Sequence, residues 1–148
     1  MKISINYSVN KKEIPLTLAE TRQLAKNVCR GENIRTGTLS IVFVSAEEIE
    51  KINIQFLNHH YPTDVMVFLL NNPNEPFEGE IYICPEMAQA QSEEYSVTYR
   101  EEVMRLIVHG VLHTAGYDDT TDEERKAMIE KGDEYITAFE QKNQRERV

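Results

Sequence analysis

Residues 103–119 read VMRLIVHGVLHTAGYDD, and this stretch predicts a long, mostly buried helix that ends in a candidate metal site. His109 and His113 are four residues apart, and side chains at that spacing project from the same face of an α-helix. A glycine follows three residues later, where a chain leaving a helix often needs a left-handed residue. Beyond it, Asp118 or Asp119 could bring a carboxylate back toward the two imidazoles. Two His and one carboxylate form a common ligand set for catalytic zinc.

A pair of His at this spacing can also serve packing or surface chemistry alone. Three features favour a metal. The chain has only four His, and two of them fall in this pattern. The preceding residues 103–108 are apolar enough to bury the helix, and buried imidazoles need partners. The carboxylates after Gly116 lie within reach of both rings.

The length and composition indicate one soluble globular domain. A chain of 148 residues can build a core without disulfide or metal staples. No apolar run approaches the length of a membrane span, and the first residues lack the apolar core of a signal peptide. Cys29 and Cys84 are far apart and are expected to be buried thiols in a reducing compartment. We therefore expect a cytoplasmic protein with no membrane partner.

The net charge of −9 argues against a protein that coats nucleic acid by electrostatics alone. The charge is uneven, because residues 1–51 hold eight Lys/Arg against six Asp/Glu, whereas residues 52–148 hold eight against nineteen. An anionic partner should therefore meet the N-terminal third, although an ordinary solvated surface is the alternative. The basic residues available there are Lys11, Lys12, Arg22, Lys26, Arg30 and Arg35, of which Arg22, Lys26, Arg30 and Arg35 are the candidate substrate-binding residues.

Hydrophobic periodicity and capping patterns predict a single α+β domain. The expected strands cover residues 2–7, 37–45, 64–70 and 80–84. The expected helices cover residues 17–30, 46–57, 85–94, 98–115 and 121–141, and residues 142–148 are expected to be frayed. This order predicts a mixed four-stranded sheet with one antiparallel hairpin, packed with about five helices. The candidate metal site lies at the end of the long fourth helix.

The sequence HGVLHTAGYDD resembles the motif HGxLHLxGYDH of the YbeY family, the metal-dependent endoribonucleases of bacterial rRNA maturation. Residues 61–65 and Phe68 resemble that family's YPTDVLSF segment, and residues 79–84 (GEIYIC) resemble its GDIxIC strand. Together these matches cover roughly residues 36–119, and they are far more specific than a single HxxxH pattern.

The resemblance implies that His109, His113 and Asp119 bind one Zn²⁺ per chain. It implies a zinc-dependent, single-strand-specific endoribonuclease that acts in small-subunit rRNA processing and in ribosome quality control. The expected partners are single-stranded rRNA and the ribosome or proteins of its small subunit. The metal-bound water would carry the chemistry, with Asp118 as a candidate for proton transfer, although Asp118 could equally cap the turn.

Three departures from the family pattern bear on activity. Asp119 stands where most members have His, and it would cancel one of the two charges of the ion. Leu57 stands where the family usually has an Arg implicated in RNA cleavage, and Leu cannot stabilise charge on a phosphorane-like transition state. Val67 replaces a small hydroxyl residue. The alternative function is therefore a metal-stabilised ribosome-assembly factor with weak or no nuclease activity, and a small-molecule hydrolase is a third option.

Four other positions complete the expectations. Gly110 stands where zinc proteases with an HExxH motif have their Glu, which disfavours a peptidase mechanism. His59 and His60 lie in a predicted loop and are expected to be surface or turn residues. Tyr117 is expected to be a packing residue with a hydrogen-bonded hydroxyl group.

Overall fold

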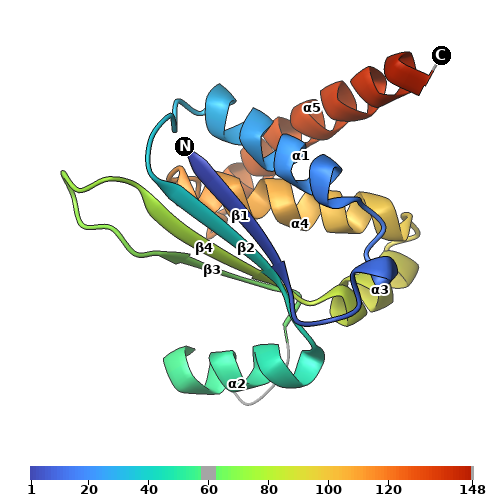
Figure 1. Ribbon diagram of the computed structural model, residues 1–148, viewed down its shortest axis with the longest axis horizontal. Helices are drawn as coiled ribbons and strands as arrows, with labels where there is room; N and C mark the ends of the chain where they lie inside the picture. Colours follow the sequence, from blue (N-terminus) through green and yellow to red (C-terminus); the bar gives the residue numbers. More distant parts are fainter. Residues whose placement is uncertain (58–62, 148) are drawn as a thin grey trace.

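The computed structural model describes residues 1–57 and 63–147, and it contains one mixed four-stranded sheet (Figure 1). The strands are β1 (Lys2–Tyr7), β2 (Thr38–Phe43), β3 (Val65–Leu69) and β4 (Glu78–Ile83), in the spatial order β1-β2-β4-β3. β1, β2 and β4 are parallel, and β3 pairs antiparallel with β4. The dense apolar strand predicted to be central is β2, which lies between β1 and β4.

Each helix begins where the sequence supplies a start signal. The helices are α1 (Leu18–Gly31), α2 (Ala46–Leu57), α3 (Pro85–Glu94), α4 (Tyr99–Thr114) and α5 (Asp122–Arg147), with a 3-10 turn, η1 (Lys11–Glu13), before α1. Thr17 and Glu20 form a capping box on α1, with two hydrogen bonds of 3.0 Å. Ser45 and Glu48 form a second capping box at the start of α2, with two hydrogen bonds of 3.1 Å.

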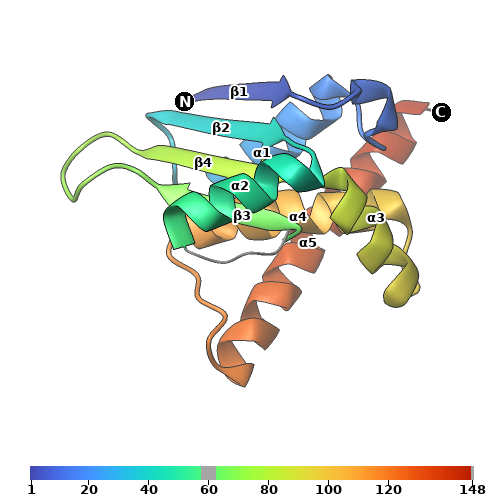
Figure 2. The same cartoon turned by 90° about the horizontal axis from the view of Figure 1, so that it is seen from below.

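Helices cover the two faces of the sheet unequally. α2 lies alone on one face, and α1, α4 and α5 lie on the other (Figures 1 and 2). α4 packs directly on the sheet, and a Cβ atom at Gly110 would lie 3.0 Å from the Ile81 side chain. The buried residues of α4 are Glu102, Val103, Met104, Leu106, Ile107, Val108, Gly110, Val111, Leu112 and Thr114. The prediction of a mostly buried helix is therefore confirmed.

The predicted α+β class and the order of elements are confirmed, and most bounds differ by one or two residues. The expectation of a frayed C-terminal tail is wrong, because α5 continues to Arg147. Phe139 is buried in the core, and the side-chain amide of Asn143 donates to Glu20 Oε2 over 3.3 Å. These contacts hold the last third of α5 against α1. No helix within the described ranges is long and apolar enough to cross a membrane.

Candidate metal site and the adjoining cleft

α4 places both histidines of the motif near its C-terminal end. The helix is fixed at its start by Thr98, whose hydroxyl oxygen accepts from the Glu101 amide over 3.0 Å. It ends at Thr114, and Gly116 then adopts a φ of 105°, the left-handed conformation predicted for this glycine. The motif therefore sits on a rigid helix and ends in a sharp turn.

His113 is oriented by the backbone beyond the helix. Its Nδ1 lies 3.0 Å from the carbonyl oxygen of Tyr117, which can only accept, so Nδ1 is the donor in this contact and Nε2 is the nitrogen left to face a ligand. That Nε2 is 3.6 Å from Oδ2 of Asp119. Donors around a tetrahedral zinc ion, each at about 2.0–2.2 Å, lie about 3.3–3.5 Å apart. His113 and Asp119 are thus spaced much as two ligands of one ion would be.

His109 is more enclosed. Its Nδ1 lies 3.4 Å from Nη1 of Arg105, and burial, then Arg105, then His113 lower its pKa to about 4. The imidazole is therefore neutral at pH 7, the form that can bind a metal. Its Nε2 faces α5 at Gly132, where an added Cβ atom would lie only 2.8 Å away. A glycine inside a helix is unfavourable by about 1 kcal/mol relative to Ala, and here it leaves room at the donor atom.

The donor set suits zinc, but the donors are not gathered into a finished cluster. Two neutral imidazoles and one carboxylate are ordinary zinc ligands. Within residues 1–57 and 63–147, no three His, Cys, Asp or Glu side chains are close enough together to form a metal-binding group. The structure brings His113 and Asp119 together, His109 interacts electrostatically with both, and Asp118 is exposed on the same loop. The three-ligand site therefore stays a prediction.

Arg105 is a residue near the site that the sequence reasoning missed. It lies one helical turn before His109, on the same face. Its guanidinium pairs with the buried Glu102 at 2.5 Å and lies 3.8 Å from Asp64 at the start of β3. These carboxylates hold the pKa of Arg105 above its usual range. The four-residue spacing of Arg105, His109 and His113 was the available signal, whereas the contact with Asp64 depends on the fold.

A cleft of about 570 Å³ adjoins His113 and Asp119, between the last turn of α2 and the end of α4. Its lining residues are Asn53, Leu57, Thr63, Val65, Met66, Val67, Phe68, Leu69, His113, Thr114 and Asp119. Leu57 and Val67, which like Asp119 depart from the family pattern, are both among these lining residues. The alignment that placed position 57 at the site is therefore supported.

The candidate substrate-binding residues lie elsewhere. Lys26, Arg30 and Arg35 line a separate hollow of about 330 Å³ together with Met1, Cys29 and Ile34. Arg22 is not part of that hollow, and its Nε lies 3.5 Å from the carbonyl oxygen of Ile3. The structure therefore groups three of the four basic residues, away from the cleft lining. His59 and His60 fall outside the described residues.

Tyr117 fills the role expected of it. Its side chain is partly buried and packs against the main core. Burial, and then a hydrogen bond to the Glu32 carboxylate, raise the pKa of its hydroxyl group. The Tyr135 hydroxyl donates to the same carboxylate over 2.5 Å. This shared acceptor ties the loop after α4 to the end of α1 and to α5.

Comparison with known proteins identifies the family. The family model described as endoribonuclease YbeY matches residues 5–140. The chain belongs to this family. It is 34% identical over 139 residues to an endoribonuclease YbeY of Chloroherpeton thalassium, a match that covers 94% of this chain and 96% of the relative. It is 40% identical over 99 residues to the endoribonuclease YbeY of Thermotoga petrophila, covering 66% of this chain and 65% of that relative.

The fold comparison agrees with the family assignment. A solution structure of a Thermotoga maritima protein superposes with a TM-score of 0.70 and 28% identity, covering 97% of this chain and 93% of that one. The resemblance to YbeY proteins is thus confirmed. At the level of the family, the predicted enzyme class is confirmed as well, because the relatives are named as endoribonucleases.

Proposed function

We propose that this protein is a zinc-dependent endoribonuclease that cleaves single-stranded rRNA during small-subunit maturation in the cytoplasm. The observation that carries the proposal is the approach of His113 Nε2 to Asp119 Oδ2 beside a cleft of about 570 Å³. His113 matches the family motif, Asp119 stands at its third ligand position, and relatives of this chain are named endoribonucleases. A cleft of this volume lies within the range of about 300–1,000 Å³ for small-ligand pockets, so it has room for part of an RNA strand.

In this proposal His109, His113 and Asp119 hold one Zn²⁺ per chain, and the three donors come closer together than they now lie. A zinc ion held there would polarise a phosphate oxygen and activate water. The Tyr117 carbonyl keeps the His113 ring oriented, and Gly132 leaves room at the His109 donor atom.

The carboxylate at position 119 tunes this site. Asp119 carries a negative charge that a His would not, so it cancels part of the charge of the ion and weakens its electrostatic pull. Asp118, the adjacent exposed residue, is the candidate for proton transfer in the same loop. The proposal therefore predicts a catalytic zinc site whose bound water would be less acidic than at a site with three His ligands.

The RNA backbone contacts the basic N-terminal third of the chain, although the protein as a whole is acidic. Lys26, Arg30 and Arg35 gather around one hollow, where they can neutralise backbone phosphates. Each phosphate contact on a single strand contributes a salt slope of roughly 0.7. Changing these three residues to Gln should lower both the RNA affinity and its slope in a salt series. The matched control changes Lys126, Lys131 and Lys142 of α5 to Gln, which removes the same charge from the acidic part of the chain. An unchanged slope would place the RNA on another face.

The nuclease proposal is tested by assaying cleavage of a single-stranded rRNA fragment with and without a chelator. Wild-type protein should cleave it only when metal is present, and Asp119→Ala should lose both zinc and activity. Asp119→His should keep both, because it restores the ligand that most of the family has. Equal losses in the two variants would identify Asp118 or another group as the third ligand.

A second function is favoured by Leu57, which lines the cleft where an Arg would be expected in the family. A site that keeps its metal but lacks this cation would suit a ribosome-assembly or quality-control factor that binds small-subunit proteins and cuts poorly. Leu57→Arg separates the two functions. If the missing cation limits cleavage, the variant should cut RNA at least about tenfold faster, as expected for a group that stabilises transition-state charge. The assembly role would be established if the zinc-loaded protein binds small subunits but neither the wild type nor Leu57→Arg cuts RNA.

A further inference from the structure

The outer edge of β3 faces the cleft with backbone groups that pair with no strand in the described chain. β3 is the last strand in the spatial order, so within residues 1–57 and 63–147 it pairs with a strand only on its β4 side. At the ends of this pairing, the Cys84 amide donates to Asp64 and the Leu70 amide donates to Glu78, each over 2.8 Å. In an antiparallel pair, residues bonded to the partner strand alternate with residues whose N–H and C=O groups point away.

That alternation assigns the outward groups. Asp64 and Leu70 bond to β4, so the register gives the same side to Met66 and Phe68. The amides and carbonyls of Val65, Val67 and Leu69 therefore point outward. All five consecutive residues 65–69 line the cleft, which shows that the cleft follows the strand edge and not one face of the sheet.

The walls beside this edge are apolar. Leu57 and Leu69 are 52% and 53% exposed, and both line the cleft. Phe56 packs edge-on against Phe68, with ring centroids 5.3 Å apart, and so holds the last turn of α2 on the sheet. Leucines on two separate elements thus flank a row of outward-pointing backbone donors and acceptors.

We propose that this part of the cleft binds an unstacked nucleobase of single-stranded RNA, beside His113 and Asp119. A base has apolar faces and an edge of donors and acceptors, which match the leucines and the β3 backbone groups. A phosphate fits poorly, because none of the described residues that line the cleft is Lys or Arg, and Asp119 is a carboxylate. Bases in a duplex are paired and cannot reach the strand edge, so the site selects single strands. The inference rests on the proposed RNA substrate but not on the metal.

The test measures RNA binding to metal-free protein in chelator, by fluorescence anisotropy of a short labelled oligoribonucleotide. The variants are Leu57→Ser with Leu69→Ser, and separately Val67→Pro, which removes one outward N–H without removing a bond to β4. The first variant removes the apolar walls and the second removes one hydrogen-bond donor to the base, so each should bind about tenfold more weakly. Ile129→Ser, on the 50% exposed residue of α5, is the control and should bind as the wild type does.

Two further ligands make the result specific. A strand of equal length with abasic positions should bind the wild type as weakly as it binds the leucine variant. A duplex should bind the wild type no more tightly than the abasic strand does. Wild-type affinity that is equal for abasic and ordinary strands would overturn the base site. The base site would also be overturned if a strand-forming peptide displaced the RNA and its binding depended on the same residues, because the peptide would then be the true occupant. Thermal melting checks that each variant is folded.

The results that would reject the base site differ from those that would reject the proposed nuclease activity. Base-dependent binding without any cleavage in zinc would leave this site in place and favour the assembly role. Zinc-dependent cleavage by the Leu57→Ser, Leu69→Ser variant at the wild-type rate and KM would remove the base site and leave the nuclease intact.

Discussion

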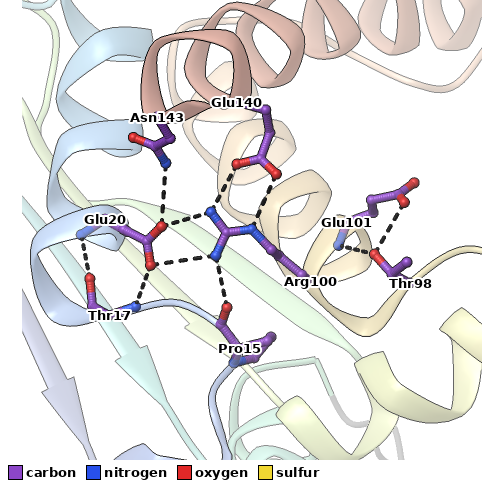
Figure 3. A network of polar contacts seen from close by, with 8 residues as sticks. All are labelled: Pro15, Thr17, Glu20, Thr98, Arg100, Glu101, Glu140 and Asn143. Carbon is purple, nitrogen blue, oxygen red and sulfur yellow. Dashed lines mark hydrogen bonds and ion pairs between the residues drawn. The ribbon is translucent and has the colours of Figure 1, made fainter. Parts of the chain in front are cut away.

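The two ends of α4 are built in opposite ways. At the first turn, the Arg100 guanidinium contacts Glu20 at 2.7 Å, Glu140 at 2.8 Å and the Pro15 carbonyl at 3.0 Å (Figure 3). Near the last turn, the described residues place a guanidinium and Gly132 beside the nitrogens of His109, and one carbonyl and a loop carboxylate beside those of His113. One end satisfies its charges within the fold, and the other leaves donor atoms for a ligand.

The difference shows where stability and function reside on a single helix. The carboxylate of Glu20 also accepts from the amide of Thr17 and from Asn143, so the Arg100 cluster ties α1, α4 and α5 together. Asp119, by contrast, is 56% exposed on the loop before α5. A helix anchored at its start can hold two imidazoles in place while the third donor remains able to move. Breaking each end separately tests this division.

The largest effect is expected at the open end. His113→Ala removes one of three proposed zinc donors. Removing a residue that only hydrogen-bonds to a metal ligand costs about 10–100-fold in metal affinity, and the loss of a ligand should cost more. The free energy of unfolding should change by less than about 1 kcal/mol, because the ring is partly exposed. Competition with a chromophoric chelator measures the first quantity, and urea denaturation the second. Zinc binding that survives the substitution would place the metal elsewhere.

The next effect is expected at the anchored end. Arg100→Met leaves Glu20 and Glu140 without their shared cation, and the free energy of unfolding should fall by about 2 kcal/mol. Fully buried pairs lose about 3–5 kcal/mol, but these three side chains are 21–35% exposed. Zinc affinity should be unchanged. The control is Lys51→Met, which breaks a largely exposed pair and should cost less than about 1 kcal/mol. Equal losses in the two variants would mean that the cluster does not anchor α4.

A smaller effect is expected where α5 crosses α4. Gly132→Ala places a Cβ atom 2.8 Å from His109 Nε2, so the ring must shift. Alanine favours the helix by about 1 kcal/mol, which should offset the strain and leave stability nearly unchanged. Zinc affinity should fall about tenfold, or about 1.4 kcal/mol. Lys131→Ala, one residue earlier, should leave it unchanged. Unaltered affinity in both would show that Nε2 of His109 is not a donor.

Local signals in the sequence predicted much of this molecule. The helix starts expected at residues 17 and 98, where the structure has the caps Thr17 and Thr98, and the left-handed Gly116 follow from residue types within a few positions. The spacing of His109 and His113 also needed only helix geometry. These features were predictable because each depends on a stretch of chain shorter than two turns.

Other features depend on contacts between distant segments. Arg100 and Glu20 are 80 residues apart, and Asn143 and Glu20 are 123 apart, so no periodicity predicts them. The extension of α5 to Arg147 was missed for this reason. The packing of Gly132 against His109 likewise depends on where α5 crosses α4. The leucine-walled cleft required knowledge that β3 is an edge strand.

The smallest effect concerns the pH dependence of the anchored end. The hydrogen bonds from Arg100, and then that from the Thr17 amide, hold the pKa of Glu20 below its ordinary value of 4.5 in the folded protein. Its contribution to stability is therefore complete above about pH 4.5 and is lost as the pH falls through the folded-state value.

Glu20→Gln keeps the shape of the side chain and removes the charge. At pH 7 the variant should be less stable than the wild type by about 1 kcal/mol, less than the about 1.5–3 kcal/mol of a hydrogen bond to a charged group, because Glu20 is partly exposed and Gln keeps part of the bonding. The difference should shrink below about pH 4.5, because the wild-type carboxyl becomes protonated and neutral like the amide. Urea titrations at several pH values measure it, with Glu94→Gln, exposed at the end of α3, as the control. A gap that stays constant into acid would mean that Glu20 acts through its shape and capping bonds, and the charge of the Arg100 cluster would then not be what fixes the start of α4.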